Sequence, residues 1–194
     1  MMQNKLSKTT LILSALTLST TFANDVVIIS IDDITVVINE ATTESTYLDA
    51  INKARSITQD CGEYGEMPPV PALKWNTQLT FAAMIHSNDL AESNTFSHTG
   101  SGESSDVVAQ LYHPGTGSTM QERIEYAGYT EWTYIGENIA AGYNTVQEVI
   151  DAWISSPGHC ANLMKEEFTE VGMSRIDNDN STYKSYWTQD FGKR

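Results

Sequence analysis

The order of helical and strand-like segments constrains the fold of this chain more than any other sequence feature. Helical patterns precede and separate three strand-like segments, which lie late in the chain at 132–141, 168–176 and 183–192. The run Asn178-Asp179-Asn180 between the last two has turn chemistry, so we expect these two strands to form an antiparallel hairpin. Helices before and between late strands indicate the α+β class with an antiparallel sheet.

Four segments have helical periodicity, and their starts carry capping signals. Asn76 is a good N-cap for the helix expected at 77–93. Ser156 followed by Pro157 predicts the N-cap and first residue of a further short helical turn. Two helices open with a capping box, in which a Thr and the Glu three residues later satisfy each other's backbone N–H. These pairs are Thr119 with Glu122 and Thr145 with Glu148, and the remaining helix is expected at about 45–57.

Two segments have no helical pattern. Residues 100–118 are rich in Gly and Ser, and they predict a long loop with a short apolar patch. Residues 24–43 form a Val/Ile-rich N-terminal extension. Its composition fits a short hairpin or an edge strand, and it also fits a poorly packed extension, so both alternatives stay open.

The first 23 residues have the pattern of a signal peptide. Lys5 and Lys8 precede an apolar run from Leu11 to Leu18, and small residues at Thr21 and Ala23 suit cleavage after Ala23. The apolar run is too short for the roughly 20 residues of a membrane-spanning helix, which argues against an anchor. We therefore expect an exported protein without a membrane span, located in the periplasm or outside the cell.

Export changes the interpretation of the two cysteines. In an oxidising compartment, Cys61 and Cys160 are expected to form a single disulfide, with two free buried thiols as the alternative. The disulfide would close a loop of roughly 100 residues, which the chain-entropy model values at about 4–5 kcal/mol as an upper figure.

The charge of the chain excludes two classes of partner. The 194 residues contain 11 Lys and Arg against 25 Asp and Glu, a formal net charge of −14. A chain this acidic is unsuited to binding nucleic acid through phosphates, and anionic membrane surfaces repel it. The sequence also lacks a nucleophile elbow, a His-Glu-x-x-His helix, a P-loop and a dinucleotide fingerprint.

Imidazole and carboxylate groups are the main candidates for site chemistry. His98 follows a predicted helix end, and His159 lies at the start of a predicted helical turn. Glu137 lies in an otherwise apolar strand, where a carboxylate needs a partner. Two imidazoles and one carboxylate are the ligand types of a zinc site, so zinc is the expected metal. We expect His86 to be a hydrogen-bonded histidine of the core and His113 to be exposed in a loop.

These residues lie in motifs by which the chain resembles the CAP superfamily, also called the SCP or TAPS domain, and in particular its bacterial branch. The motifs run in family order over roughly residues 46–192. They include Leu73-Lys74-Trp75-Asn76, Phe96-Ser97-His98-Thr99-Gly100, Gly136-Glu137-Asn138-Ile139, Ser156-Pro157-Gly158-His159 with Ala161-Asn162-Leu163, and Tyr186-Trp187-Thr188-Gln189-Asp190-Phe191-Gly192.

The resemblance implies an α-β-α sandwich with a central antiparallel sheet over residues 44–194 and a cleft at the sheet. Many members line this cleft with two His and two Glu that hold a divalent metal. By motif, His98, His159 and Glu137 match three of the four, and Asn138 would lie beside them. Ser156 stands where the second Glu is expected, so the site loses a ligand and a negative charge. The segment from about 103 to 119 is then either a lid over the cleft or a surface insertion.

The resemblance also frames the functional expectations. The first is a monomeric binding module, in which the cleft holds a divalent metal, zinc first, together with a small lipid-like or wall-related ligand or a protein partner. The second is a metal-dependent hydrolase, which lacks an evident nucleophile. The third is a structural envelope protein. The sequence leaves open whether the protein is an enzyme.

Overall fold

The computed structural model describes residues 27–31, 34–38 and 40–194, and these form two compact units divided at Asn39 and Glu40. In the first unit, β1 (Val27–Ile31) and β2 (Ile34–Ile38) pair antiparallel, with Ile31 opposite Ile34. The strand-like alternative for the extension therefore holds for these residues. The expected signal peptide at 1–23 lies outside the described residues.

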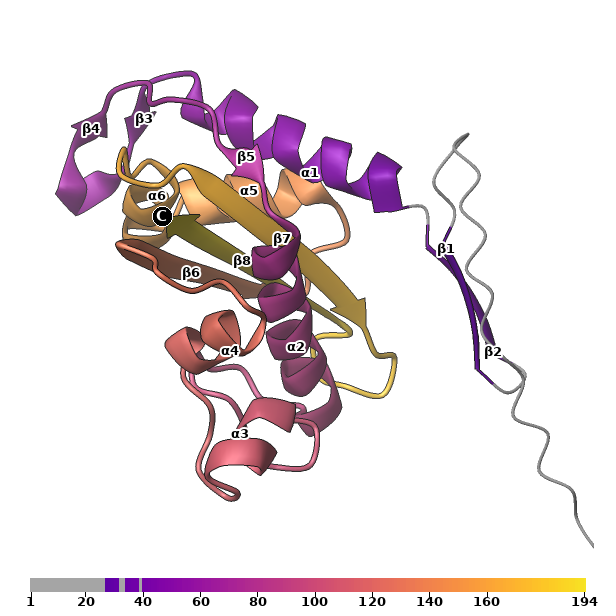
Figure 1. Cartoon of the computed structure of the whole chain (residues 1–194). Helices are drawn as coiled ribbons and strands as arrows, with labels where there is room; N and C mark the ends of the chain where they lie inside the picture. Colours follow the sequence, from indigo (N-terminus) through magenta and orange to yellow (C-terminus); the bar gives the residue numbers. More distant parts are fainter. Residues whose placement is uncertain (1–26, 32–33, 39) are drawn as a thin grey trace, which may run out of the picture. The chain divides into compact units, whose positions relative to one another are not determined.

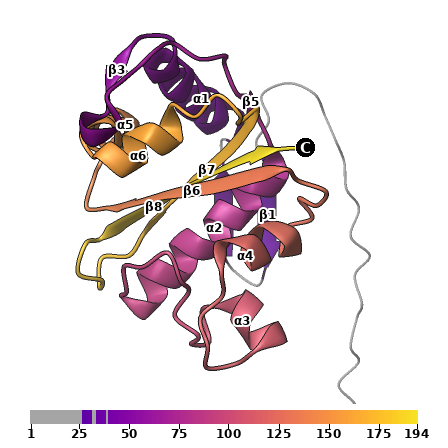
Figure 2. The ribbon, with the colours of Figure 1, turned by 90° about the vertical axis from the view of Figure 1, so that its left-hand side faces the viewer.

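The second unit is a sandwich of helices on both faces of a sheet (Figures 1 and 2). The strand order is β5-β7-β8-β6, which makes β6 an edge strand. One face carries α1, α5 and α6, and the other carries α2 and α4 (Figure 2). The bounds are α1 Glu40–Arg55, β5 Lys74–Trp75, α2 Thr77–Ser93, α4 Met120–Tyr126, β6 Tyr134–Ala141, α5 Val146–Ile154, α6 Pro157–Leu163, β7 Glu170–Asp177 and β8 Ser185–Lys193. This architecture confirms the predicted α+β class and the α-β-α layering.

The predicted local signals form as expected. The Asn76 side chain accepts hydrogen bonds from the backbone N–H groups of Gln78 and Leu79, and both capping boxes are present. β7 and β8 form the expected antiparallel hairpin. Cys61 and Cys160 form the expected disulfide, which ties the short turn Gly62–Tyr64 and its neighbouring strands β3 (Gln59–Asp60) and β4 (Glu66–Met67) to α6.

Two elements differ from the sequence prediction. The segment 100–118 contains a helix, α3 (Val107–Tyr112), because the Asp106 side chain caps it by accepting from the Ala109 N–H. The sheet is not wholly antiparallel, because β5 pairs in parallel with β7 through two residues. A two-residue strand has no periodicity of its own, so the sequence could not predict it.

Alternation along β8 and the edge strand β6 places successive side chains on opposite faces of the sheet. On β8, Trp187 and Phe191 pack into the core beneath α1, α5 and α6. Thr188 and Asp190 point to the opposite face, where the Ser87 hydroxyl of α2 donates to Thr188 at 2.9 Å. Because successive side chains on a strand point to opposite faces, residues opposite these on β6 follow the same division.

Candidate functional site

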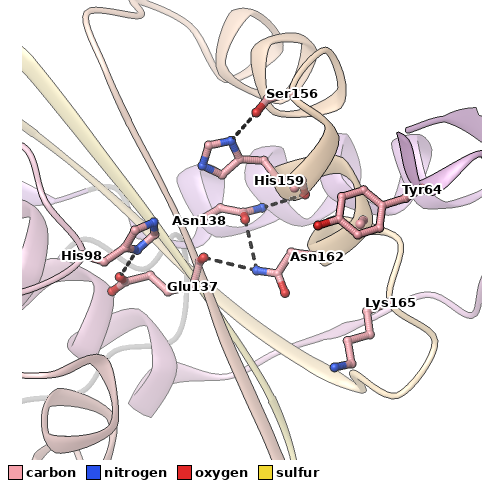
Figure 3. A pocket seen from close by; sticks show the side chains of 10 residues that line it. Tyr64, His98, Glu137, Asn138, Ser156, His159, Asn162 and Lys165 are labelled. Atoms are coloured by element: carbon pink, nitrogen blue, oxygen red, sulfur yellow. Dashed lines mark hydrogen bonds and ion pairs between the residues drawn. The ribbon is translucent and has the colours of Figure 1, made fainter. Parts of the chain in front are cut away.

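The candidate site lies at the free edge of β6. Glu137 pairs with Asp190 across the strands and faces the α2 layer, whereas Asn138 pairs with Gln189 and faces the α6 layer. A cleft of about 460 Å³ opens beside both residues (Figure 3). His98, from the segment after α2, reaches it from one layer, and His159 of α6 reaches it from the other. The structure thus brings together the predicted residues His98, Glu137, Asn138, Ser156 and His159 as lining residues.

Glu137 is a buried carboxylate with partners on both oxygens. The His98 Nδ1–H donates to Oε1 at 2.7 Å, and the Arg123 Nη2 donates to Oε2 at 2.8 Å. Burial raises the pKa of Glu137, but the His98 and Arg123 bonds outweigh it and hold the pKa well below its usual value. Glu137 is therefore ionised at neutral pH, and its charge is compensated by Arg123 within the protein.

Ser156 and His159 form a pair of their own. Ser156 stands at the N-cap position of α6, but its side chain makes no capping bond there. Its hydroxyl lies 2.8 Å from His159 Nδ1 instead. The predicted N-cap position of Ser156 before Pro157 is therefore confirmed, but its side chain does not cap the helix, because its hydroxyl is bonded to the imidazole. Burial lowers the pKa of His159, and the neighbouring His98 lowers it further.

Amide side chains fix the geometry between the two histidines. Asn138 Nδ2 donates to the His159 carbonyl at 3.3 Å and to Gln189 Oε1 at 3.1 Å. Asn162 Nδ2 donates to the Glu137 carbonyl at 3.2 Å and to Asn138 Oδ1 at 3.0 Å. Asn162 thereby satisfies a backbone carbonyl that the edge strand leaves open.

A divalent metal needs more free donor atoms than the cleft residues offer. Zinc sites in proteins use three or four side-chain ligands. Both oxygens of Glu137 are already bonded, and the Ser156 hydroxyl is bonded to His159. Across residues 27–31, 34–38 and 40–194, no group of three His, Cys, Asp or Glu side chains is placed to hold an ion. The side chains as arranged therefore do not fit a zinc ion. Metal binding at this cleft, which the resemblance implies, stays an untested prediction.

The sequence prediction missed several residues of the site. Asn162 lies in a matched motif and Arg123 directly follows the capping-box residue Glu122, yet nothing local assigns either of them a role. Tyr64 and Lys165 also line the cleft. Tyr64 reaches it from the turn that the disulfide holds, a placement that depends on a contact across 99 residues of sequence.

The segment 100–118 does not cover the cleft. Asp89 binds it to α2, accepting hydrogen bonds from Ser101 and Ser105 at 2.6 Å. None of the described residues 100–118 lines the cleft. The segment is therefore a surface insertion rather than a lid over the cleft. His113 is not simply exposed as predicted, because its Nε2 lies 2.9 Å from Glu122 Oε1 and ties the segment to α4.

Behind Glu137 lies a buried polar layer between the sheet and α2. His86 is fully buried, as predicted, and its Nε2 lies 3.0 Å from the Ser97 carbonyl. Burial lowers the pKa of His86 to about 4, so this imidazole is neutral at neutral pH. Asp190 is also buried, and neither of its carboxyl oxygens has a hydrogen-bond partner among the described atoms.

Asp190→Asn is expected to stabilise the protein increasingly as the pH rises. Burial and the Glu137 charge raise the pKa of Asp190 well above 3.8, with Arg123 opposing. At pH values between 3.8 and this raised pKa, the Asp190 carboxyl is ionised in the unfolded chain and protonated in the folded protein. Wild-type stability therefore falls with pH by up to about 1.4 kcal/mol per unit, a loss that Asn does not share. Urea unfolding of both proteins from pH 4 to 8 measures this, and a difference independent of pH would contradict it.

Comparisons with known proteins agree with the fold and the motifs. The model of the cysteine-rich secretory protein family, CAP, matches residues 48–191. The uncharacterized membrane protein YlbC of Bacillus subtilis is 30% identical over 122 residues, which cover 63% of this chain and 29% of that protein. The uncharacterized protein YkwD of the same species is 29% identical over 61% of this chain and 38% of its own length. The match thus spans well under half of either relative.

Solved structures show the same fold. An extracellular protein with an SCP domain from Bacillus anthracis superposes with a TM-score of 0.56 at 26% identity, covering 80% of this chain and 42% of that one. An outer surface protein of Borrelia burgdorferi gives a TM-score of 0.58 at 20% identity, over 81% of this chain and 96% of that one. None of the described helices is long and apolar enough to span a membrane. With its fold, its ordered motifs and its family match in agreement, the chain belongs to the CAP family of cysteine-rich secretory proteins.

Proposed function

We propose that this protein is an exported, non-catalytic binding module whose cleft holds a small polar ligand of the cell wall. The predicted signal peptide supports export. The related structures described as an extracellular protein and an outer surface protein support a location beyond the cytoplasmic membrane. This function is compatible with a periplasmic location and with a fully extracellular one. We also propose that the protein acts as a monomer.

One observation carries the proposal: polar groups line the cleft without partners. Four residues that line the cleft have a polar atom to spare. These atoms are His98 Nε2, His159 Nε2, the Tyr64 hydroxyl and the Lys165 ammonium. None of the four has a hydrogen-bond or ion-pair partner among residues 40–194 of the structure. Groups that face one cavity and have unused bonding capacity are those that a ligand satisfies.

The polar lining favours a wall-related ligand over a lipid-like one. A smaller pocket of about 240 Å³ adjoins the cleft, and Ser156 and His159 line both. Its other walls include Phe96 and Tyr183, whose rings lie 5.8 Å apart. Aromatic faces beside polar groups suit the face of a sugar ring as well as an alkyl chain.

A hydrolase is the second candidate, because of the 2.8 Å contact between Ser156 Oγ and His159 Nδ1. A serine beside an imidazole is the start of a nucleophile and base pair. No acid holds the other nitrogen of His159 in the described part of the chain, so the third member of a triad is missing. We therefore rank hydrolysis below binding.

The test combines purified cell-wall sacculi with the protein spanning residues 24–194. Co-sedimentation measures binding, and mass spectrometry of the soluble fraction measures released fragments. Binding is expected, with loss in the His98→Ala/His159→Ala double variant and no released fragments. Fragments that disappear with Ser156→Ala would favour the hydrolase. An absence of sedimentation, together with a lowered Tm in the double variant, would favour the structural envelope role and contradict the proposal.

A further inference from the structure

The charges around the cleft identify the class of ligand. Glu137 is the single acid among the residues that line it, and Arg123 compensates its charge from inside the protein. Lys165 also lines the cleft, and no carboxylate among the described residues pairs with its ammonium. Its ammonium instead lies over the rings of Tyr134 and Phe168, at 5.2 and 5.5 Å from their centroids. The lining therefore carries an uncompensated positive charge.

The local positive charge of Lys165 contrasts with the negative net charge of the whole chain. The protein has a net charge of −14, so its long-range field repels anions. At physiological ionic strength that field is screened beyond about 8 Å, whereas a direct contact with Lys165 is not. Lys165 thus acts at short range, as a ligand contact, rather than by attracting anions from a distance.

The His98 end of the cleft offers a hydrogen-bond acceptor, whereas the Lys165 end offers donors. The ionised Glu137 only accepts hydrogen bonds, so His98 donates to it through Nδ1. In its neutral form, His98 therefore presents the lone pair of Nε2, which needs a donor. Figure 3 shows His98 on one side of Asn162, and Tyr64 with Lys165 on the other. One ligand that spans the cleft meets an acceptor at one end and donors at the other.

We infer that the cleft binds a small hydroxylated anion. Its carboxylate or phosphate accepts from Lys165 and Tyr64, and its hydroxyl or amide N–H donates to His98 Nε2. Acidic sugars and sugar phosphates have this chemistry. The inference rests on the proposed binding function and names the ligand class of the same site.

Ser156 fits this assignment. The resemblance placed a second Glu at this position, whose charge would favour a cation in the cleft. The serine is neutral, so Glu137 stays the single acid among the residues that line the cleft. The site that does not fit a zinc ion is therefore suited to the opposite charge.

The first experiment compares three probes that differ in charge. N-acetylmuramic acid carries a carboxylate, N-acetylglucosamine 6-phosphate carries a phosphate, and N-acetylglucosamine carries neither. Amide chemical shifts of the protein, titrated with each probe, give the affinity and the location of binding. We expect at least one anion to bind in the cleft about tenfold or more tightly than the neutral sugar, as a charge-assisted hydrogen bond implies. The two anions distinguish a carboxylate ligand from a phosphate ligand.

Lys165→Gln is expected to remove this preference, so that anionic and neutral probes bind alike. Lys193→Gln is the matched control. Its ammonium lies 5.9 Å from the Tyr134 ring centroid, but it is not among the residues lining the cleft, so the preference should persist. Equal affinity for the neutral sugar in the wild type overturns the inference and leaves the binding function intact. If none of the three probes shifts cleft resonances, the inference and the proposed function both fail.

Ser156→Glu provides the reciprocal test. An added carboxylate beside His159 is expected to weaken anion binding and to tighten zinc binding, each by about tenfold or more. Calorimetry with zinc alone, on the wild type and the variant, measures the second change. Wild-type zinc binding as tight as that of the variant would overturn the assignment of the cleft to anions.

Discussion

Arg123→Met is expected to destabilise the protein by about 3–5 kcal/mol, because it leaves the buried Glu137 carboxylate without its main counter-charge. The two side chains are 1% and 2% exposed, and the bond between them is 2.8 Å long. Arg123 also donates to the Ser118 and His98 carbonyls at 2.8 and 2.9 Å, so the variant loses these bonds too. Urea unfolding at pH 7 measures the loss.

The pH dependence of this effect follows from Glu137. Its folded pKa lies well below the unfolded value, so its ionised form stabilises the fold above the unfolded pKa. That stabilisation is lost as the pH falls through the folded pKa. The difference between the wild type and Arg123→Met is therefore expected to be largest at neutral pH and to shrink in acid.

Two comparisons isolate the ion pair. Adding Glu137→Gln to Arg123→Met removes the uncompensated charge, so the double variant is expected to be more stable than Arg123→Met alone. Arg194→Met is the control at an exposed pair, because Arg194 lies 3.4 Å from Glu170 and is 42% exposed. It is expected to change stability by about 1 kcal/mol or less. A double variant less stable than Arg123→Met would show that Arg123 acts through packing rather than charge.

Arg123 also shows what the sequence could not predict about the site. The capping box at Thr119 and Glu122 is local, so the start of its helix was predicted correctly. The direction in which Arg123 points depends on how that helix packs on the sheet. Nothing near Arg123 in the sequence indicates a carboxylate on β6. The motifs identified five of the residues that line the cleft, whereas Tyr64, Lys165 and the compensation of Glu137 required the three-dimensional structure.

As at the site, the parts of the fold that depend on neighbouring residues could be predicted from the sequence, and a pairing between distant residues could not. Helix caps, the hairpin turn and the alternation on β8 depend on neighbours within a few residues. The parallel pairing of Trp75 with Val171 depends on residues far apart in the chain, and it was missed. The helix at Val107–Tyr112 was missed for another reason, since its Asp106 cap is a local signal that the surrounding Gly and Ser residues obscured.

The disulfide has the second large expected effect. Cys61→Ala/Cys160→Ala is expected to lose about 3–5 kcal/mol of stability, because the bond closes a loop of 99 residues in the unfolded chain. Both half-cystines are fully buried, so alanine also leaves a small void at each site. Urea unfolding of the oxidised wild type and the double variant gives the difference.

The reduced wild type is the control for the bond itself. Reductant is expected to lower the stability of the wild type toward that of the variant and to leave the variant unchanged. The bond holds the Gly62–Tyr64 turn against α6, where a Cβ on Gly62 would lie 2.9 Å from the Pro157 ring. Its loss should therefore also broaden the amide resonances of Tyr64 and weaken anion binding, since Tyr64 forms one wall of the cleft. Unchanged anion affinity in a folded, reduced protein would show that Tyr64 is held by packing alone and contributes to the cleft without the disulfide.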